Sequence, residues 1–232
     1  LPLIKNNNHE AWHDKFKACA KIEYEKVIHH DLNPTSKGLN MSEIVAMLSD
    51  QTNGAAIVVP DVGQHQMIAG RYYRYTTTDG WATSGGLGTM GYALPASLGC
   101  KMAAPNRQVV AIIGDGCFQM NIQELGTINQ TGAAVKIIIM NNGFLGMVRQ
   151  WQELFFDRRY SFTELHNPDF ITIAKGYGIK GRTISKREEL AAALQEMLDS
   201  PSSYVLECIV EREVNVFPMI ASGTGVGDIL LE

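Results

Sequence analysis

Residues 108–148 of the sequence read QVVAIIGDGCFQMNIQELGTINQTGAAVKIIIMNNGFLGMV, and this stretch decides the fold. Two apolar, β-branched runs within it, 109–113 and 135–140, each end abruptly in a polar turn, as buried strands do. Between them, 118–130 has apolar residues at helical spacing and is followed by Gly132, which favours a helix end. The stretch therefore predicts strand, turn, helix and strand, and such a crossover makes the two strands parallel.

Polar turns follow both predicted strands, and each carries an oxygen-bearing side chain. Asp115 leaves the carboxyl end of the first strand and Asn142 leaves that of the second. If the strands are neighbours, they lie only about 5 Å apart, so the two side chains face one crevice. Gly114 and Gly116 would let the backbone approach a ligand closely, and the following helix would direct its free N–H groups at a phosphate.

The charge of this crevice predicts what it binds. The turn contains no lysine, and Asp115 by itself would repel a phosphate. A hard divalent cation removes that conflict, with Asp115 and the amide oxygen of Asn142 as ligands and phosphate oxygens at other octahedral positions. The sequence therefore predicts a site for a metal-bound diphosphate.

A longer pattern around this site resembles the signature of thiamine diphosphate enzymes. From Leu98 to Cys117 the chain has Leu-Gly, five residues, Pro105, four residues and V-x-I-x-G-D-G-C, and Asn142 follows Asp115 by 27 positions. This pattern is long and specific. The resemblance implies the thiamine diphosphate-binding fold, an α/β open parallel sheet with helices on both faces.

Three further segments resemble the carboxyl-terminal domain of the acetohydroxyacid synthase (acetolactate synthase) catalytic subunit. They are DVGQHQM at 61–67, TSGGLGTMGYALPA at 83–96 and GMVRQWQ at 146–152. Together with the signature, the resemblance covers roughly residues 53–220.

The resemblance implies roles for residues around the cofactor. The segment 62–65 would lie against the diphosphate, Met90 would support the bent cofactor between its two rings, and the carbonyl of Phe144 would be the third protein ligand of the metal. Met147 and Val148 would lie against the aminopyrimidine. The cofactor-binding residues expected are Val62, Gly63, Gln64, His65, Gly88, Met90, Gly114, Asp115, Gly116, Cys117, Asn142, Phe144, Leu145, Gly146, Met147 and Val148; those expected to bind the metal are Asp115, Asn142 and Phe144.

The glycine pattern at 86–91 has the spacing of a dinucleotide-binding fingerprint, GxGxxG. That fingerprint requires a buried strand immediately before it, and 71–84 is not one. We therefore interpret the segment as a glycine-rich turn into a helix over 89–103, in which Gly88 lets the cofactor lie close.

Trp151 lies four residues after Met147, so in a helix the two would share a face. Trp151 could be a core tryptophan; the resemblance implies a wall of the substrate pocket that favours a larger second 2-oxo acid. At Gly143 and Phe144 the chain departs from commoner family members, which have polar residues there. A backbone carbonyl ligand is insensitive to that change.

For the whole enzyme the resemblance implies decarboxylation of pyruvate and transfer of the hydroxyethyl group to pyruvate or 2-oxobutyrate, in branched-chain amino-acid synthesis. It also implies a bound FAD, a regulatory small subunit and a homodimer or tetramer of catalytic subunits. The activating Glu belongs to a separate pyrimidine-binding domain in this family. We expect no catalytic residue in this chain, because Glu124 is predicted to lie mid-helix and exposed, and we expect the chain alone to be inactive.

Two alternatives remain at this point. The chain could belong to another thiamine diphosphate-dependent 2-oxo acid decarboxylase or oxidase, although Trp151 argues against this. It could also be a non-catalytic cofactor-binding or subunit-association module. Assaying acetolactate with the amino-terminal portion added would separate these alternatives.

Composition and charge exclude several functions. The chain has 232 residues, 45% of them hydrophobic and 19% charged, and a net charge of −4, so no basic face favours nucleic acid. No apolar run reaches the roughly 18 residues of a membrane span. The four cysteines show no metal-binding spacing. A reducing cytoplasm is the simplest setting, with a plastid or mitochondrion as the eukaryotic alternative.

The rest of the chain predicts one α/β domain with flanking segments. We expect a linker and amino-terminal helix over 1–40, the cofactor-binding domain over 41–213 and a carboxyl-terminal tail over 214–232. Asn40 with Glu43, and Ser185 with Glu188, are each spaced to cap a helix. About five strands alternate with helices, which indicates a parallel sheet covered on both faces.

Overall fold

The computed structural model describes residues 8–232, which fall into two compact units. The larger unit is Thr35–Val216, and the smaller combines Phe217–Glu232 with the described part of Leu1–Pro34. Residues 1–7, where the linker is predicted to begin, lie outside the described residues. Within 8–232, no helix combines the length and the apolar character needed to cross a membrane.

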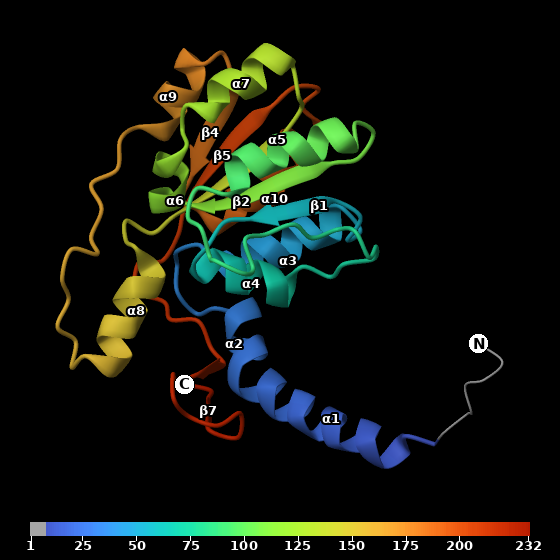
Figure 1. The fold of residues 1–232 in the computed structure, drawn as a ribbon, viewed down its shortest axis with the longest axis vertical. Coiled ribbons are helices and arrows are strands. Elements are labelled where there is room, and N and C mark those ends of the chain that lie inside the picture. Colours follow the sequence, from blue (N-terminus) through green and yellow to red (C-terminus); the bar gives the residue numbers. More distant parts are fainter. Residues whose placement is uncertain (1–7) are drawn as a thin grey trace. The chain divides into compact units, whose positions relative to one another are not determined.

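The larger unit is built on a five-stranded sheet in which every neighbouring pair is parallel (Figure 1). The strand order is β1-β2-β3-β5-β4, so the first three strands are neighbours in chain order, β5 pairs with β3, and β4 forms the edge beyond β5. This architecture confirms the predicted α/β fold. The strands are β1 (Ile57–Pro60), β2 (Val109–Gly114), β3 (Lys136–Asn141), β4 (Lys180–Ile184) and β5 (Tyr204–Ile209).

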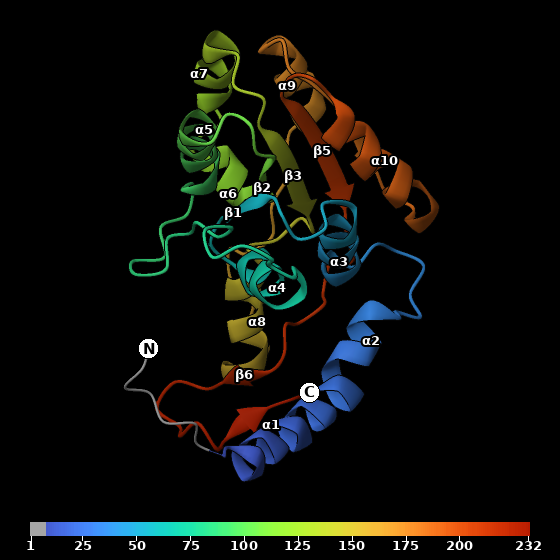
Figure 2. The same cartoon turned by 90° about the vertical axis from the view of Figure 1, so that its right-hand side faces the viewer.

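Helices cover both faces of this sheet, as expected (Figure 2). Helices α5, α7 and α9 pack on one face, where their apolar side chains join those of β1, β2 and β3 in one core cluster. Helices α3, α4 and α10 cover the other face. The helices of this unit are α3 (Met41–Gln51), α4 (Gln64–Tyr72), α5 (Ala93–Ala103), α6 (Asp115–Met120), α7 (Glu124–Thr131), α8 (Gly146–Phe155), α9 (Phe170–Gly176) and α10 (Arg187–Asp199).

The register of the central strands brings the two predicted metal ligands to one edge. β2 pairs directly with β3, with Gly114 opposite Met140. Asp115 and Asn142 each follow the carboxyl end of their strand. The prediction that these side chains share an edge of the sheet is therefore confirmed.

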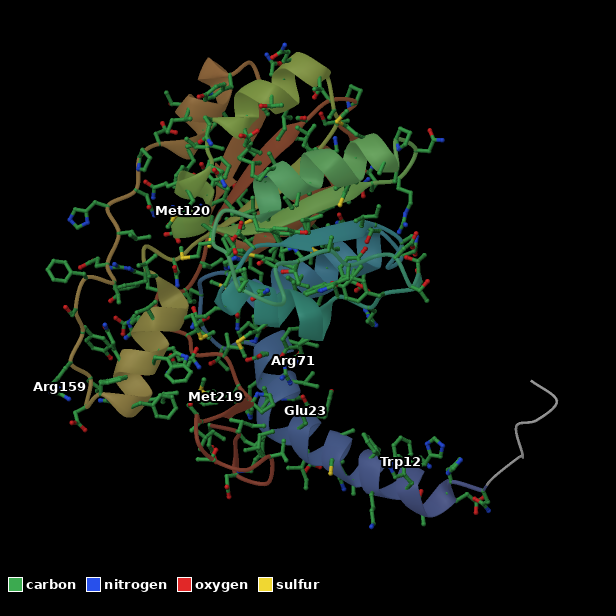
Figure 3. The ribbon with its side chains drawn as sticks, in the orientation of Figure 1. Trp12, Glu23, Arg71, Met120, Arg159 and Met219 are labelled. Atoms are coloured by element: carbon green, nitrogen blue, oxygen red, sulfur yellow. The ribbon has the colours of Figure 1, made fainter. Side chains whose placement is uncertain are left out.

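The helix predicted over 118–130 is two helices, α6 and α7, separated by residues 121–123. Asn121 ends α6 and its side-chain amide donates to the carbonyl of Gly91 at 2.7 Å, a contact that holds the break. Met120, expected on the apolar stripe, is 55% exposed at the end of α6 (Figure 3). The tertiary contact of one asparagine overrides the helical periodicity.

Two helix starts test the capping predictions. At α3, Asn40 and Glu43 form the predicted capping box, with the Glu43 carboxylate accepting from the Asn40 N–H at 3.0 Å. At α10 the predicted pair, Ser185 and Glu188, is wrong by one residue. Lys186 is the N-cap, and its N–H donates to Glu189.

The smaller unit contains a nearly continuous helix and a short hairpin. The helix consists of α1 (Glu10–Glu23), the π-helical turn η1 (Tyr24–Ile28) and α2 (His29–Leu32), in the region where an amino-terminal helix is expected. Trp12 is exposed on α1 (Figure 3). Phe16, on the same helix, is also exposed. The hairpin pairs β6 (Met219–Ile220) with β7 (Ile229–Leu230) in antiparallel fashion.

Lys136, at the start of β3, is a buried cation with only 1% of its surface exposed. Its ammonium group donates to the carbonyls of Ser200 and Ser202, both at 2.6 Å, just beyond the end of α10. Burial lowers the pKa of Lys136 to about 8, and Lys101 contributes in the same direction. This contact ties the sheet to the turn that precedes β5.

We expect Lys136→Met to lower the free energy of unfolding by about 1–3 kcal/mol, because two buried carbonyls lose their donor. Urea denaturation measures this. Lys101→Met is the matched control, since Lys101 also donates to two carbonyls but at the surface, where water can replace it. An equal decrease in the free energy of unfolding for the two variants would contradict a special role of the buried Lys136 contact.

The same contact predicts a pH dependence. Because the pKa of Lys136 is lowered from 10.5 to about 8, the folded chain releases this proton before the unfolded chain does. The stability of the wild type relative to Lys136→Met should therefore rise with pH between about 8 and 10.5. A difference that stays constant or falls over this window would be inconsistent with a desolvated ammonium group.

Candidate functional site

A cavity lies at the carboxyl edge of the sheet, where the segments after β1, β2 and β3 meet the start of α8. It contains every residue predicted to bind the cofactor except Gly88. Met41 and Met140 also line it, and sequence reasoning did not identify them. The lining residues are Met41, Val62, Gly63, Gln64, His65, Met90, Gly114, Asp115, Gly116, Cys117, Met140, Asn142, Phe144, Leu145, Gly146, Met147 and Val148.

The Asp115 carboxylate is buried, with 1% of its surface exposed, and accepts three hydrogen bonds. Its Oδ1 accepts from the N–H of Gly116 at 3.0 Å. Its Oδ2 accepts from the N–H of Gly143 at 2.9 Å and from the side-chain amide of Asn167 at 2.7 Å. Burial raises the pKa of Asp115, and these hydrogen bonds oppose the rise. Two carboxylate oxygens offer about four lone pairs, so one acceptor position, on Oδ1, remains for a ligand.

Asn142 and Phe144 provide two further oxygens at the same cavity. Asn142 Oδ1 accepts from the N–H of Phe144 at 3.1 Å and keeps a second lone pair. Phe144 pairs with Glu164 in an isolated antiparallel bridge whose hydrogen bonds use the groups on either side of Phe144. Among the backbone hydrogen bonds of turns, loops and helix caps within residues 8–232, none ends on the carbonyl oxygen of Phe144.

The chemistry of these donors fits a hard divalent cation. One carboxylate oxygen, one amide oxygen and one backbone carbonyl each have free acceptor capacity on residues of a single cavity. Mg²⁺ and Ca²⁺ prefer such oxygen ligands, and Mg²⁺ usually completes its octahedron with water or phosphate oxygens.

His65 presents an unpaired polar atom to this cavity. It is 5% exposed, and its Nε2 has no hydrogen-bond partner. Burial lowers the pKa of His65 to about 4, although the nearby Asp61 acts in the opposite direction, so the ring is neutral at pH 7. A buried polar atom without a partner is costly and points to a ligand that completes it.

Two glycines of the turn keep the cavity open. A Cβ at Gly114 would lie 2.8 Å from Cε1 of His65, and one at Gly116 would lie 2.7 Å from Cδ2 of Leu145. A side chain at either position would therefore displace His65 or Leu145, both of which line the cavity. Glycine at these positions lets the two side chains lie close to the turn backbone.

The side-chain amide of Gln64 is less available to a ligand than the resemblance implies. Its side-chain amide donates to Oε1 of Gln150 at 2.9 Å and to the carbonyl of Val214 at 3.0 Å. Gln64 therefore lines the cavity while holding α8 and the segment after β5 together.

Asp61 is a residue whose importance sequence reasoning missed. It is fully buried, and it accepts from the N–H groups of Val62, Gly91 and Ala93 at 2.8–2.9 Å. These bonds explain why the helix predicted over 89–103 begins at Ala93, since Asp61 holds the preceding residues out of the helix. Its place directly after the first strand is the signal that could have identified it.

Asp61 also belongs to a buried cluster with His65 and Cys117, whose potential ligand atoms lie within 4.8 Å of one another. The Cys117 thiol donates to the carbonyl of Val62, and burial next to Asp61 raises the pKa of that thiol. The Asp61 carboxylate already accepts three backbone N–H groups. We therefore interpret Asp61 and Cys117 as residues that hold the backbone around the cavity by hydrogen bonds.

Met90 and Gly88 lie on the segment that Asp61 holds. Met90 lines the cavity and packs against the core cluster. Gly88 has a φ of +62°, which favours glycine, and its nearest side chain is Val62. Gly88 is thus a turn residue beside the cavity, and the structure does not place it on the cavity wall.

Trp151 lies on α8 beside a second, more open cavity. It shares this cavity with Val148, Gln152, Phe156 and Arg159, and its ring packs against Phe155 at 5.0 Å between centroids. Val148 lines both cavities, so Trp151 is one helical turn from the first. It is partly exposed and is not a core tryptophan.

Asn167 lies in the loop before α9, a segment in which the sequence shows no periodicity. It reaches Asp115 although 52 residues separate them in the chain. No local pattern indicates such a contact.

No glutamate lies among the residues that line the cavity in the described chain. Glu124 opens α7, where its carboxylate accepts from Thr127, and is not mid-helix as predicted. It is half-buried.

Comparison with known relatives identifies similar proteins. The chain is 44% identical over 188 residues to the acetolactate synthase isozyme 2 large subunit of Escherichia coli (strain K12), which covers 81% of this chain and 34% of that protein. It is 40% identical over 229 residues to the acetolactate synthase large subunit of Cyanidium caldarium, covering 98% of this chain and 38% of that protein. The chain thus spans about a third of the length of these relatives.

A similar solved structure is that of the Rhodococcus jostii RHA1 thiamine diphosphate-dependent 4-hydroxybenzoylformate decarboxylase. The TM-score is 0.69 at 26% sequence identity, over 76% of this chain and 33% of that one. The sequence also matches the family described as thiamine pyrophosphate enzyme, C-terminal TPP binding domain, over residues 61–208, which include the segments after β1, β2 and β3 that form the cavity. On this match the chain belongs to the family of carboxyl-terminal thiamine pyrophosphate-binding domains of thiamine pyrophosphate enzymes.

Proposed function

We propose that the cavity at the carboxyl edge of the sheet binds the diphosphate of thiamine diphosphate through Mg²⁺, with Asp115, Asn142 and the carbonyl of Phe144 as protein ligands. The observation that carries this proposal is the set of oxygens with free acceptor capacity on these three residues. A cation next to a buried carboxylate also offsets the repulsion between Asp115 and phosphate oxygens.

In this proposal the remaining lining residues contact the diphosphate and the two rings of the cofactor. Nε2 of neutral His65 donates to a diphosphate oxygen when it carries the ring proton, and it accepts from a bound water when it does not. Glycines 114 and 116 leave room for the phosphates, whereas Met90, Met147 and Val148 offer apolar surface to the rings. Gly88 holds the turn before Met90.

For the protein that contains this domain we propose acetolactate synthase activity, with pyruvate as donor and pyruvate or 2-oxobutyrate as acceptor. Identity of 40–44% to acetolactate synthase large subunits supports this reading over a decarboxylase or oxidase, since the similar decarboxylase structure is only 26% identical. Thiamine diphosphate supplies a nucleophilic carbon when its thiazolium C2 loses a proton. The residues of this chain bind and orient it.

Further partners and the location follow from the same proposal. A bound FAD, a regulatory small subunit, and a homodimer or tetramer of catalytic subunits would accompany the whole enzyme. We propose a cytoplasmic location in a bacterium and an organelle in a eukaryote, where the similar relatives from Nicotiana tabacum and Saccharomyces cerevisiae are named chloroplastic and mitochondrial.

Binding of thiamine diphosphate by this chain should require Mg²⁺, and Asp115→Ala should abolish it, because the diphosphate then loses its cation. Titration calorimetry with Mg²⁺ or with EDTA measures this. Cys117→Ser is the matched control, since a hydroxyl can also donate to the carbonyl of Val62. Undiminished affinity in EDTA would rule out the metal assignment.

Trp151→Leu in the full-length enzyme should lower the preference for 2-oxobutyrate over pyruvate and leave acetolactate formation intact. 2-Oxobutyrate has one methylene more than pyruvate, and a Trp151 side chain that contacts this group contributes about 1–3 kcal/mol of discrimination between the two acceptors. Competition between the two acceptors measures the product ratio. An unchanged ratio would assign Trp151 to packing against Phe155 only.

This chain, saturated with cofactor and metal, should exchange the C2 proton of thiamine diphosphate no faster than the free cofactor does. The residues that line its cavity position the cofactor but include no carboxylic acid besides Asp115. General acid–base assistance, which typically contributes about 10²–10⁴ in rate, would come from elsewhere in the protein. NMR in D₂O measures the exchange, and fast exchange lost in Glu124→Gln would identify an activating acid here.

A further inference from the structure

Asn167 makes three side-chain hydrogen bonds that link the Asp115 carboxylate to the next strand. Its Nδ2 donates to Oδ2 of Asp115 at 2.7 Å and to Oδ1 of Asn141 at 3.0 Å. Its Oδ1 accepts from the side-chain amide of Gln119 at 2.9 Å. Both hydrogens of the Asn167 amide are therefore in use, and each points to an acceptor.

A buried carboxylate fixes the direction of these bonds. Glu207 on β5 accepts from Nδ2 of Asn141 at 2.8 Å and from the hydroxyl of Thr183, its register partner on β4, at 2.6 Å. Because an ionised carboxylate only accepts, Asn141 must turn its amide nitrogen to Glu207 and its oxygen to Asn167. Asn167 must then donate, and it donates to Asp115.

The same chain of bonds holds the loop that follows β3. The N–H of Gly143 is shared between Oδ2 of Asp115 at 2.9 Å and Oδ1 of Asn141 at 3.1 Å. Oδ2 of Asp115 is therefore filled by Gly143 and Asn167, whereas within the described part of the chain Oδ1 accepts from Gly116 alone. The network leaves one defined oxygen of Asp115 free and fixes the first residue of the loop that carries Asn142 and Phe144.

We propose that Asn167 is a positioning residue for the metal-binding carboxylate of Asp115, with its amide orientation set by Asn141 and Glu207. This inference rests on the proposed function, since it concerns the same cation. The network crosses β2, β3, β5 and β4, which are consecutive in the sheet, so the rigidity of the sheet is transmitted to one carboxylate oxygen. Residues that orient metal ligands in this way typically change metal affinity about 10–100-fold when they are replaced.

The ratio of Mg²⁺ affinity to Ca²⁺ affinity distinguishes a positioning role of Asn167 from a purely structural one, because loss of structure alone would not change this ratio. Mg²⁺ demands nearly ideal octahedral geometry, whereas Ca²⁺ tolerates irregular geometry and variable coordination. A carboxylate that is free to rotate should therefore harm Mg²⁺ binding more than Ca²⁺ binding. The ratio of the two affinities reports the orientation of Asp115, because a general loss of folded protein lowers both equally.

The test is titration calorimetry of thiamine diphosphate into the chain at a series of Mg²⁺ or Ca²⁺ concentrations. Asn167→Ala should lower the apparent Mg²⁺ affinity about tenfold or more and the Ca²⁺ affinity clearly less. Asp169→Ala is the matched control from the same segment. It removes the cap of α9, where Asp169 accepts from the N–H and hydroxyl of Thr172, and should lower the melting temperature without changing the Mg²⁺/Ca²⁺ ratio.

A second pair of variants tests the network at a distance. Glu207→Leu, which does not touch Asp115, should also lower the Mg²⁺/Ca²⁺ ratio, and Glu207→Gln should lower it less, because its amide oxygen can still accept from Asn141. Mg²⁺-dependent binding in the wild type with an unchanged ratio in Asn167→Ala and Glu207→Leu would overturn this inference alone. Binding without any divalent cation in the wild type would instead overturn the proposed function.

Discussion

Parallel hydrogen bonding between β2 and β3 sets Gly114 opposite Met140 and so delivers Asp115 and Asn142 to the same edge of the sheet. Every other feature of the site depends on this pairing. The loop after β1 reaches the same edge because β1 is the other neighbour of β2, and α8 begins there because it follows β3. A crevice at the carboxyl ends of parallel strands is where ligands bind in open α/β sheets.

Two buried carboxylates support this edge, and the chain satisfies both with N–H donors. Asp61 accepts three backbone N–H groups, and Asp115 accepts two together with the Asn167 amide. Burial of a carboxylate is costly unless hydrogen bonds compensate. Asp61 is thereby a structural anchor for the segment that carries Met90, whereas Asp115 keeps an acceptor position for a ligand.

Polar atoms without hydrogen-bond partners lie at the cavity. Nε2 of His65 has no hydrogen-bond partner within residues 8–232, and the carbonyl of Phe144 accepts no backbone hydrogen bond from the turns, loops and helix caps of these residues. The Phe144 ring, in contrast, is held between the guanidinium groups of Arg149 and Arg212, 5.4 and 4.6 Å from its centroid. The aromatic side chain of Phe144 therefore has its own packing partners, apart from its backbone carbonyl. The cavity has a polar end and an apolar wall, and its lining residues in the described chain include no carboxylic acid besides Asp115.

The sequence by itself determined the parallel sheet, the pairing of the two signature strands and nearly all residues of the cavity, because these depend on hydrophobic periodicity and on short motifs whose residues are contiguous. It did not determine where helices break or which distant side chains complete the site. Asn121 divides a periodic segment by bonding to Gly91, Asp61 delays the start of α5, and Asn167 reaches Asp115 from an irregular loop. Each of these effects rests on one or two hydrogen bonds between residues at least 30 positions apart. Local propensity carries no information about such bonds, so only the tertiary structure decided them.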